Sequence, residues 1–245
     1  MFNILVHPHL PSDSPLKKAA NALDFLEPYA RWLGARDKTL SRWFLAAGSL
    51  EEALQYEAFA KGYNGHEATK AILTARYAKS TEPVIVLWNG EDSADTGAGL
   101  VLSIVDSVYT SELDISLDGP PGQSRIGGWK SVAELVALAV VDLRPEYASV
   151  QDRTAYFKKK VFPDRPGVGW MLYLPRTLSA QDVPEAEALV PVMEGKTQLG
   201  TIMVSVTDTV FDELKPEHVK RSNAIETRLV SQDMLPTWTQ LMRPS

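Results

Sequence analysis

Hydrophobic positions recur along the chain with two periods, one typical of amphipathic helices and one typical of strands. Serine caps, prolines at first helical positions and Gly/Pro turns mark where the elements begin and end. The pattern predicts helices over residues 16–33, 50–59, 66–79, 132–143, 179–194 and 216–229. It predicts strands over residues 2–6, 42–46, 84–88, 99–105, 113–117, 147–150, 169–174 and 199–206. This mixture predicts an α+β fold with a mixed or antiparallel sheet and flanking helices.

Some of these elements carry predictions about their place in the fold. Residues 2–6 form a short apolar run that ends at Pro8, so we expect an edge strand. Residues 84–88 are apolar at every position, which is typical of a strand buried on both faces. The helix over 132–143 is apolar nearly all round and is expected at the centre of the fold. Pro28 is expected to kink or split the first helix.

The two halves of the chain show a similar order of predicted elements. Residues 43–88 are predicted to contain a strand, a serine cap, a helix and a strand, and residues 170–206 repeat this order. The similarity suggests two related strand–helix–strand halves. Candidate boundaries occur only at residues 119–122 and 151–169, and neither resembles a linker. Residues 1–245 are therefore predicted to form a single domain.

The composition excludes several classes of protein. The 245 residues contain no cysteine, which excludes disulfides, thiolate nucleophiles and cysteine-based zinc sites. The net charge of −6 is unsuited to non-specific binding of nucleic acid, which needs clustered Lys and Arg. Purely apolar runs fall far short of the roughly 20 residues of a membrane-spanning helix, and the N-terminus does not resemble a signal peptide. We therefore expect a cytoplasmic protein that needs no cofactor and contacts neither membrane nor nucleic acid.

The acidic residues are concentrated in one segment. Residues 80–124 contain eight acids and no Lys or Arg, whereas the rest of the chain has 25 basic and 23 acidic residues. The eight are Glu82, Glu91, Asp92, Asp95, Asp106, Glu112, Asp114 and Asp118. Several fall in predicted turns at 89–98 and 106–114, which we expect at one end of the strands. Such an acidic rim can steer a basic partner. A solubilising surface is the alternative, and calcium binding lacks the usual loop spacing.

Two short matches to enzyme motifs have plain structural alternatives. Asp95-Thr96-Gly97-Ala98 matches the aspartic-protease tetrad, but the chain has no second copy, and a polar turn explains the same residues. Asp164, Glu194 and Lys196 match a metal-dependent nuclease pattern, in which carboxylates hold Mg²⁺. That pattern needs Glu and Lys on the same side of one strand, whereas Gly195 and a predicted helix end fall at this position.

Two further groups of side chains are candidate binding sites, one for a metal ion and one for nucleic acid. His7 and His9 would share a strand face and begin a metal site, but no third ligand is near in sequence, so surface or capping roles are the alternative. Residues 158–160 are three lysines beside Phe157 and Phe162, an arrangement able to contact nucleic acid. In a chain of net charge −6 a solvated basic face explains these lysines better.

Short motifs follow one another along the chain in a distinctive order. They are Trp43-Phe44-Leu45, Ser49-Leu50-Glu51-Glu52-Ala53, residues 84–90, Gly128-Trp129, Arg144-Pro145-Glu146-Tyr147, Gly169-Trp170, Val204-Ser205-Val206 and residues 223–236. In this order the chain resembles the immunity protein 52 family of bacterial polymorphic toxin systems. The resemblance implies a cytoplasmic inhibitor without catalysis of its own. It also implies a partner, a type VI effector that is a nuclease toxin of restriction-endonuclease-like fold, bound in a tight complex.

An inhibitor of a DNA-cutting enzyme fits an acidic surface, because nuclease clefts bind phosphate and tend to be basic. We expect the toxin to contact the acidic loops between residues 89 and 118. Trp129 is a candidate aromatic anchor, with core packing as its alternative. The residues assigned to the toxin contact are Glu91, Asp92, Asp95, Glu112, Asp114, Asp118 and Trp129. Two other functions stay open, an effector adaptor or chaperone without inhibition and a divergent metal-dependent nuclease.

Overall fold

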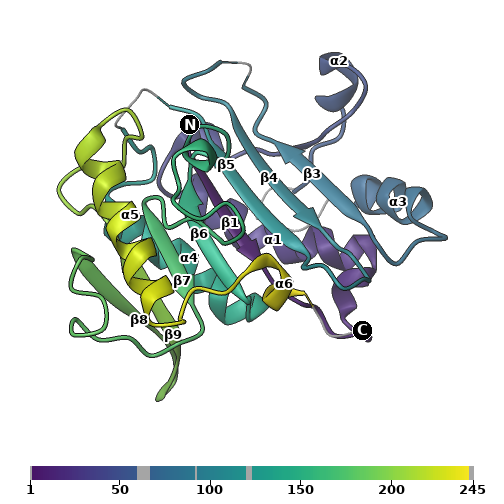
Figure 1. The fold of residues 1–245 in the computed structure, drawn as a ribbon. Coiled ribbons are helices and arrows are strands. Elements are labelled where there is room, and N and C mark those ends of the chain that lie inside the picture. The colour runs from purple at the N-terminus through teal and green to yellow at the C-terminus, as the bar shows by residue number, and fades with distance from the viewer. Residues whose placement is uncertain (1, 60–66, 92, 120–122, 243–245) are drawn as a thin grey trace.

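The computed structural model describes residues 2–59, 67–91, 93–119 and 123–242. Within them nine strands form one antiparallel sheet in the order β2-β3-β4-β5-β1-β6-β7-β9-β8, accompanied by six α-helices (Figure 1). The strands are β1 (Phe2–His7), β2 (Phe44–Leu45), β3 (Val84–Trp88), β4 (Ala98–Ser103), β5 (Glu112–Leu117), β6 (Tyr147–Gln151), β7 (Met171–Leu174), β8 (Ala188–Glu194) and β9 (Thr197–Val204). The helices are α1 (Ala19–Gly34), α2 (Leu50–Ala53), α3 (Glu67–Arg76), α4 (Trp129–Leu143), α5 (Pro216–Ser231) and α6 (Trp238–Leu241). The predicted α+β class with an antiparallel sheet and flanking helices is confirmed.

The first strand, β1, lies at the centre of the sheet. It pairs with β5, where Ile4 lies opposite Ile115, and with β6, where Ile4 lies opposite Val150. Ile4 and Val6 are fully buried. The prediction of an edge strand is wrong, because Pro8 only ends the strand. The proline carries no information about the strands that pair with β1, because β5 and β6 lie far along the chain.

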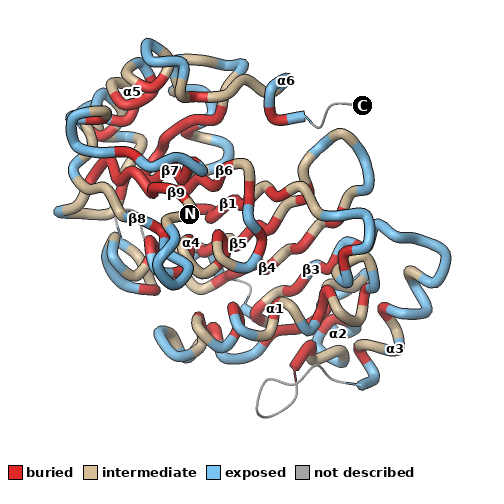
Figure 2. Tube along the Cα trace, turned by 90° about the horizontal axis from the view of Figure 1, so that it is seen from below, coloured by how far each residue is buried: buried red, intermediate tan, exposed pale blue. Residues whose placement is uncertain are grey.

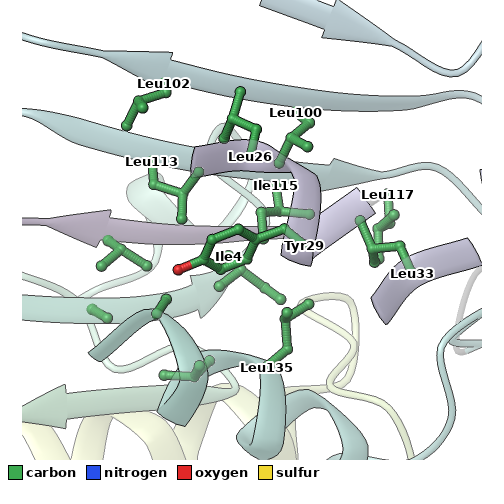
Figure 3. Close-up of a cluster of buried hydrophobic side chains, with 14 of the residues drawn as sticks. Ile4, Leu26, Tyr29, Leu33, Leu100, Leu102, Leu113, Ile115, Leu117 and Leu135 are labelled. Carbon is green, nitrogen blue, oxygen red and sulfur yellow. The ribbon is translucent and has the colours of Figure 1, made fainter. Parts of the chain in front are cut away.

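One face of the sheet is covered by α1 and α4 and carries the main hydrophobic core (Figure 3). α1 contributes Leu26, Tyr29 and Leu33, and α4 contributes Leu135. These side chains of α1 and α4 pack against every second residue of the strands, because successive side chains of a strand point to opposite faces. These strand residues include Ile4, Leu100, Leu102, Leu113, Ile115 and Leu117. With seven buried residues, α4 is central as predicted.

The opposite face is covered over only part of its width. α5 and α6 pack over β6, β7 and β9, where Leu172, Leu174 and Met203 form a second hydrophobic core with Ile225 and Leu229 of α5. Figures 1 and 2 show α5 and α6 on the side of the sheet away from α1, and no helix of the described residues lies over β3 and β4 on that side. The sheet thus has one fully covered face and one face that is covered only in part.

Residues 179–194 do not form the predicted helix. Ser179 donates its N–H (2.8 Å) and its hydroxyl (2.7 Å) to Oδ2 of Asp182, which closes a local turn instead of capping a helix. β8 follows, and Gly195 with a φ of 58° opens the two-residue turn to β9, as β-hairpins favour. β7, β8 and β9 are consecutive strands without a helix between them, so the suggested repeat of two strand–helix–strand halves is not seen.

The remaining differences concern where helices begin and end. The helix predicted over 50–59 ends at Ala53, and α4 begins at Trp129 rather than at residue 132. α1 continues through Pro28 without a break, because a proline removes one intrahelical hydrogen bond while the buried side of the helix keeps its contacts. Among the described residues, none of the helices has both the length and the apolar character needed to cross a membrane.

We expect Ile4→Ala and Val86→Ala to differ sharply in their effect on stability. Ile4 is fully buried, so its truncation should lower the free energy of unfolding by about 2–5 kcal/mol. Val86 is 37% exposed on the partly covered face, and its truncation should cost less than about 1 kcal/mol. Urea denaturation of both variants measures the difference. Equal effects would contradict the central place of β1.

Candidate functional site

We call the surface of β3, β4 and β5 that points away from α1 and α4 the open face (Figure 2). Its side chains belong to every second residue of these strands, because the residues between them point into the main core. They are Val84, Val86 and Trp88 of β3, Gly99, Val101 and Ser103 of β4, and Glu112, Asp114 and Ser116 of β5. The open face is therefore mainly apolar over β3 and acidic over β5.

β3 does not follow the prediction of a strand buried on both faces. Ile85 and Leu87 are fully buried, but Val84 and Val86 are 38% and 37% exposed. Val86 lies opposite Val101, which extends the exposed apolar strip onto β4. The prediction failed because an apolar run indicates that both faces avoid water. It does not indicate whether this chain itself covers both of them.

A shallow hollow of about 480 Å³ lies at the end of the open face near residues 89–97. The lining residues that matter here are Val86, Trp88, Glu91, Gly99, Val101 and Asp118. Gly99 has no side chain, which keeps the surface of the sheet low at this point, and an added Cβ would lie 2.6 Å from Oγ of Ser116. Nε1 of Trp88 donates to the backbone oxygen of Glu91 at 2.9 Å, which holds the indole ring beside the hollow.

The turn at residues 89–97 is held by Asn89, whose side chain is buried. Nδ2 of Asn89 donates to the backbone oxygens of Thr39 (3.1 Å) and Thr96 (2.9 Å). Oδ1 of Asn89 accepts from the backbone N–H of Ala98 at 2.9 Å. One amide side chain thus connects both ends of the turn to the segment that precedes β2.

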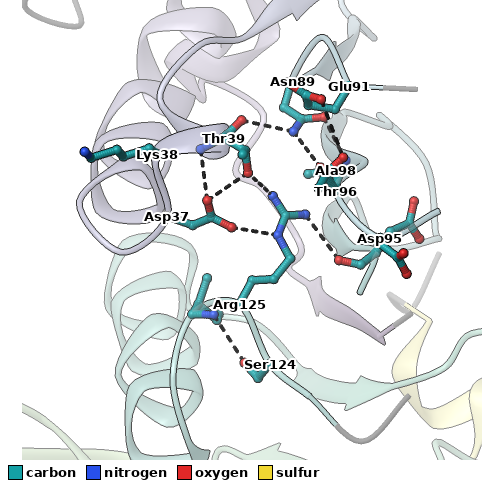
Figure 4. A network of polar contacts seen from close by, with 12 residues as sticks. Asp37, Lys38, Thr39, Asn89, Glu91, Asp95, Thr96, Ala98, Ser124 and Arg125 are labelled. Carbon is teal, nitrogen blue, oxygen red and sulfur yellow. Dashed lines mark hydrogen bonds and ion pairs between the residues drawn. The ribbon is translucent and has the colours of Figure 1, made fainter. Parts of the chain in front are cut away.

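Arg125 holds the same turn from a second direction (Figure 4). Its Nε donates to Oδ2 of Asp37 (2.7 Å), and its Nη1 donates to the backbone oxygens of Gly97 (2.9 Å) and Asp118 (3.2 Å). Its Nη2 donates to Oγ1 of Thr39. Burial raises the pKa of Asp37, but hydrogen bonds from Arg125 and Thr39 outweigh burial and hold this pKa below its ordinary value. The ionised pair therefore fixes the turn against the body of the protein.

Three of the acids assigned to the toxin contact lie at this end of the open face. Glu91 and Asp95 are exposed in the turn, and Asp118 directly follows β5. None of the three forms an ion pair with another residue that the structure describes. Asp92 lies outside the described residues. The negative charge at the hollow is therefore not neutralised by the described part of the chain.

The second predicted acidic turn lies at the opposite end of the strands. The register aligns Trp88 with Gly99 at one end of the β3–β4 pair and Val84 with Ser103 at the other. Ser103 in turn lies opposite Glu112. The expectation that the turns at 89–98 and 106–114 meet at one end is wrong, because consecutive antiparallel connections alternate between the two ends of a sheet.

Glu112 and Asp114 are engaged by Arg153. Nη2 of Arg153 lies 2.7 Å from Oε2 of Glu112, and Nη1 lies 2.9 Å from Oδ2 of Asp114. Asp114 also accepts a hydrogen bond of 2.9 Å from Nδ2 of Asn3 in β1. Burial raises the pKa of Asp114 and outweighs the opposing influence of Asn3 and Arg153. These two acids therefore connect β5 to β1 and to the segment after β6.

His7 is partly buried beside this group. Its Nε2 lies 3.7 Å from Oε2 of Glu112, and its ring stacks on that of Tyr147 with centroids 4.4 Å apart. Burial, and next the charge of Arg153, lowers the pKa of His7 to about 3. The ring is consequently neutral near pH 7, so its contact with Glu112 is not an ion pair.

Trp129 does not join the acids. It is the first residue of α4, on the covered side of the sheet, and is partly buried against the main core. Nζ of Lys130 lies 5.6 Å from the centre of its ring. Core packing, which was the alternative for this residue, accounts for its position.

The nuclease and protease motifs occupy ordinary structural positions. Asp95 lies in a polar turn, as its alternative predicts. Glu194 ends β8 and pairs with Arg144, whereas Lys196 lies in the following hairpin turn. The backbone oxygen of Asp164 accepts from the N–H of Trp238 at 2.9 Å, on the side of α6. In the part of the chain that the structure describes, no group of three His, Asp or Glu residues is placed to hold a metal ion.

The histidine and lysine candidates also have local roles. Nε2 of His9 lies 2.7 Å from the backbone oxygen of Leu241 and so contacts α6. Nζ of Lys159 donates to the backbone oxygen of Glu213 at 2.6 Å. Nζ of Lys160 donates to two backbone oxygens within its own loop, at 3.2 and 2.7 Å. Two of the three lysines therefore fasten loops rather than form a free basic surface.

Sequence reasoning missed the side chains that build and support the open face. Arg125 and Arg153 belong to no motif, and the bonds from Asn89 to Thr39, from Arg125 to Asp37 and from Arg153 to Asp114 join residues that lie far apart in sequence. The only available signal was the Asn89-Gly90 pair after an apolar strand, which indicated a turn but not its anchor.

The chain is similar to known proteins both in sequence and in fold. The model of the family described as Immunity protein 52 matches residues 17–237 of this chain. A solved structure described as Pseudomonas aeruginosa T6SS protein PA0821 has a similar fold, with a TM-score of 0.54 and 11% sequence identity. The match covers 94% of this chain and 72% of that chain, and at this identity it concerns the fold alone. No curated protein matches the sequence.

We expect Arg125→Met to destabilise the protein by about 2 kcal/mol, because it leaves Asp37 without its partner and frees one side of the 89–97 turn. Arg76→Met is the matched control, since Arg76 is exposed at the end of α3, and it should change stability by less than about 0.5 kcal/mol. Urea denaturation compares the two variants. A similar small effect for both would show that the Arg125 network does not hold the turn.

His7 should make stability depend on pH in the weakly acidic range. The unfolded chain protonates histidine near pH 6.5, whereas the folded protein does so only near pH 3. The contribution of His7 to stability is thus complete above pH 6.5 and is lost progressively as the pH falls toward the folded value. His7→Phe should make the decline between pH 6.5 and 5 shallower, by up to about 1.4 kcal/mol per pH unit. Urea denaturation at several pH values tests this, and parallel pH profiles would refute it.

Proposed function

Because the chain belongs to the immunity protein 52 family, we propose that it neutralises a nuclease toxin by forming a tight complex with it in the cytoplasm. Immunity proteins bind a cognate toxin, and the family match includes most of the sheet and α1, α4 and α5. The similar fold of a type VI secretion protein supports a toxin delivered by that kind of system. The proposed role requires a specific surface and no catalytic group of its own.

The observation that carries this proposal is the group of acids without ion pairs at the 89–97 turn. A nuclease binds the phosphates of its substrate through Lys and Arg, so its working surface is positive. Glu91, Asp95 and Asp118 complement such a surface and would increase the rate of association. Because Asn89 and Arg125 already hold the turn, little conformational entropy is lost when the toxin binds.

We divide the assigned contact residues into three groups by their surroundings. Glu91, Asp95 and Asp118 remain proposed contacts, and Asp92 joins them on the ground of its position in the sequence. Glu112 and Asp114 form ion pairs with Arg153, so we no longer propose them as contacts of the toxin. Trp129 lies on the covered side of the sheet, away from the acids, and is not part of the proposed surface.

Co-expression with the product of the open reading frame next to the one for this protein, as the candidate toxin, tests the function. We expect the cells to survive and the two proteins to purify together. A stable complex without protection would favour the adaptor or chaperone function instead. Failure of both survival and complex formation would contradict the proposal.

The charge-reversed variant Glu91→Lys/Asp95→Lys tests the contact surface. We expect the association rate at low salt to fall about tenfold and to become less dependent on salt concentration. Asp208→Lys/Glu217→Lys is the matched control, because it makes the same change of charge at exposed residues near the start of α5. Stopped-flow or surface-plasmon-resonance measurements give the rates. Equal rates for the two variants would remove the acidic turn from the interface.

A further inference from the structure

We propose that the apolar strip of the open face, Val84, Val86, Trp88 and Val101, is the water-excluded centre of the toxin interface. The segment that it binds carries apolar side chains next to an Arg or Lys. This inference rests on the proposed function and identifies where and through what chemistry that function acts. The acids at the 89–97 turn then form the rim of the same surface.

The first argument comes from β3. A strand with one face in water normally alternates apolar and polar residues. β3 is apolar on both faces, although its Val84 and Val86 point away from the core and are 38% and 37% exposed. Val101 of the neighbouring strand enlarges the same strip. The strip is therefore built for burial, but the described part of the chain provides no helix to bury it.

The second argument comes from the hollow beside the strip. Gly99 lacks a side chain, and the small Ser116 is its neighbour on β5, so a partner side chain is able to approach the sheet. The indole ring of Trp88 and the acids Glu91 and Asp118 line the same hollow. An Arg or Lys fits this combination, because its stem is apolar and its charged end is attracted by carboxylates and by an aromatic ring.

The third argument decides between a toxin and a second copy of this chain. In a two-fold dimer the same patch would meet itself, so Glu91, Asp95 and Asp118 of both copies would be brought into one interface. These acids have no ion-pair partners among the described residues, and juxtaposed like charges oppose association. A partner with basic residues beside its apolar ones suits both the strip and its rim.

The central variant is Val86→Thr/Val101→Thr, which keeps the shape and the strand preference of both residues but replaces apolar methyl groups by hydroxyls. We expect its affinity for the toxin identified by co-expression to fall about tenfold or more, mainly through faster dissociation. This differs from the acidic variants, which should act mainly on association. Val161→Thr is the matched control, because Val161 is 43% exposed in the loop that leads to β7, on the side of α5.

A second variant keeps the test informative if the double variant loses stability. Gly99→Val places a side chain in the hollow, where its Cβ would meet the movable hydroxyl of Ser116 at 2.6 Å and other atoms at no less than 3.9 Å. We expect the variant to remain folded by circular dichroism and to bind the toxin at least about tenfold more weakly. Unchanged binding by both variants, with the wild type binding and protecting normally, would refute this inference and leave the proposed function intact.

The remaining outcomes are also distinct. If the wild-type protein neither binds nor protects, the proposed function itself fails. If analytical ultracentrifugation of the wild type alone shows a dimer that Gly99→Val converts to a monomer, the strip belongs to an interface between two copies, and the inference is overturned.

Discussion

The insertion of β1 into the middle of the sheet is the constraint on which the rest of the structure depends. β1 pairs with β5 and β6, so it joins the sheet half built from β2 to β5 to the half built from β6 to β9. Asn3 and Arg153 reinforce the joint through Asp114, which is buried and hydrogen-bonded to both. Without β1 each half would expose a long central edge, and the core beneath α1 and α4 would be divided.

The second constraint is the unequal cover of the two faces. α5 is fastened over the β6–β9 half by Glu226, a fully buried carboxylate that accepts from the hydroxyl of Tyr156 (2.7 Å) and from the N–H groups of Val161 (2.8 Å) and Val168 (3.0 Å). These bonds satisfy the carboxylate and tie the long segment before β7 to the helix. The other half of this face has no such anchor and no helix among the described residues (Figure 1). The open face is thus a consequence of where α5 is held.

Acidic residues serve two different purposes on this framework. Glu112 and Asp114 pair with Arg153 and connect strands at the centre of the sheet, whereas Glu91 and Asp95 are exposed on a turn to which Asn89 and Arg125 form hydrogen bonds. An inhibitor acts through the shape and charge of a surface, which ordinary residue types provide. Among the described residues, the matches to enzyme motifs lie in a polar turn, at the end of β8 and in the hairpin turn that follows it.

The amino-acid sequence by itself determined the α+β class, the family resemblance and the place of the elements whose periodicity is strong, such as β3 and α5, because side-chain period and caps are local properties. The tertiary structure alone decided that β1 is central, that residues 188–194 pair as a strand with β9, and that the acidic turns lie at opposite ends of the sheet. It also decided the partners of Arg125 and Arg153 and the exposure of one side of β3. These features depend on which distant segments pair and which face a helix covers. Such pairings arise when the whole core packs, so they leave no repeating signal in the chain near the residues concerned.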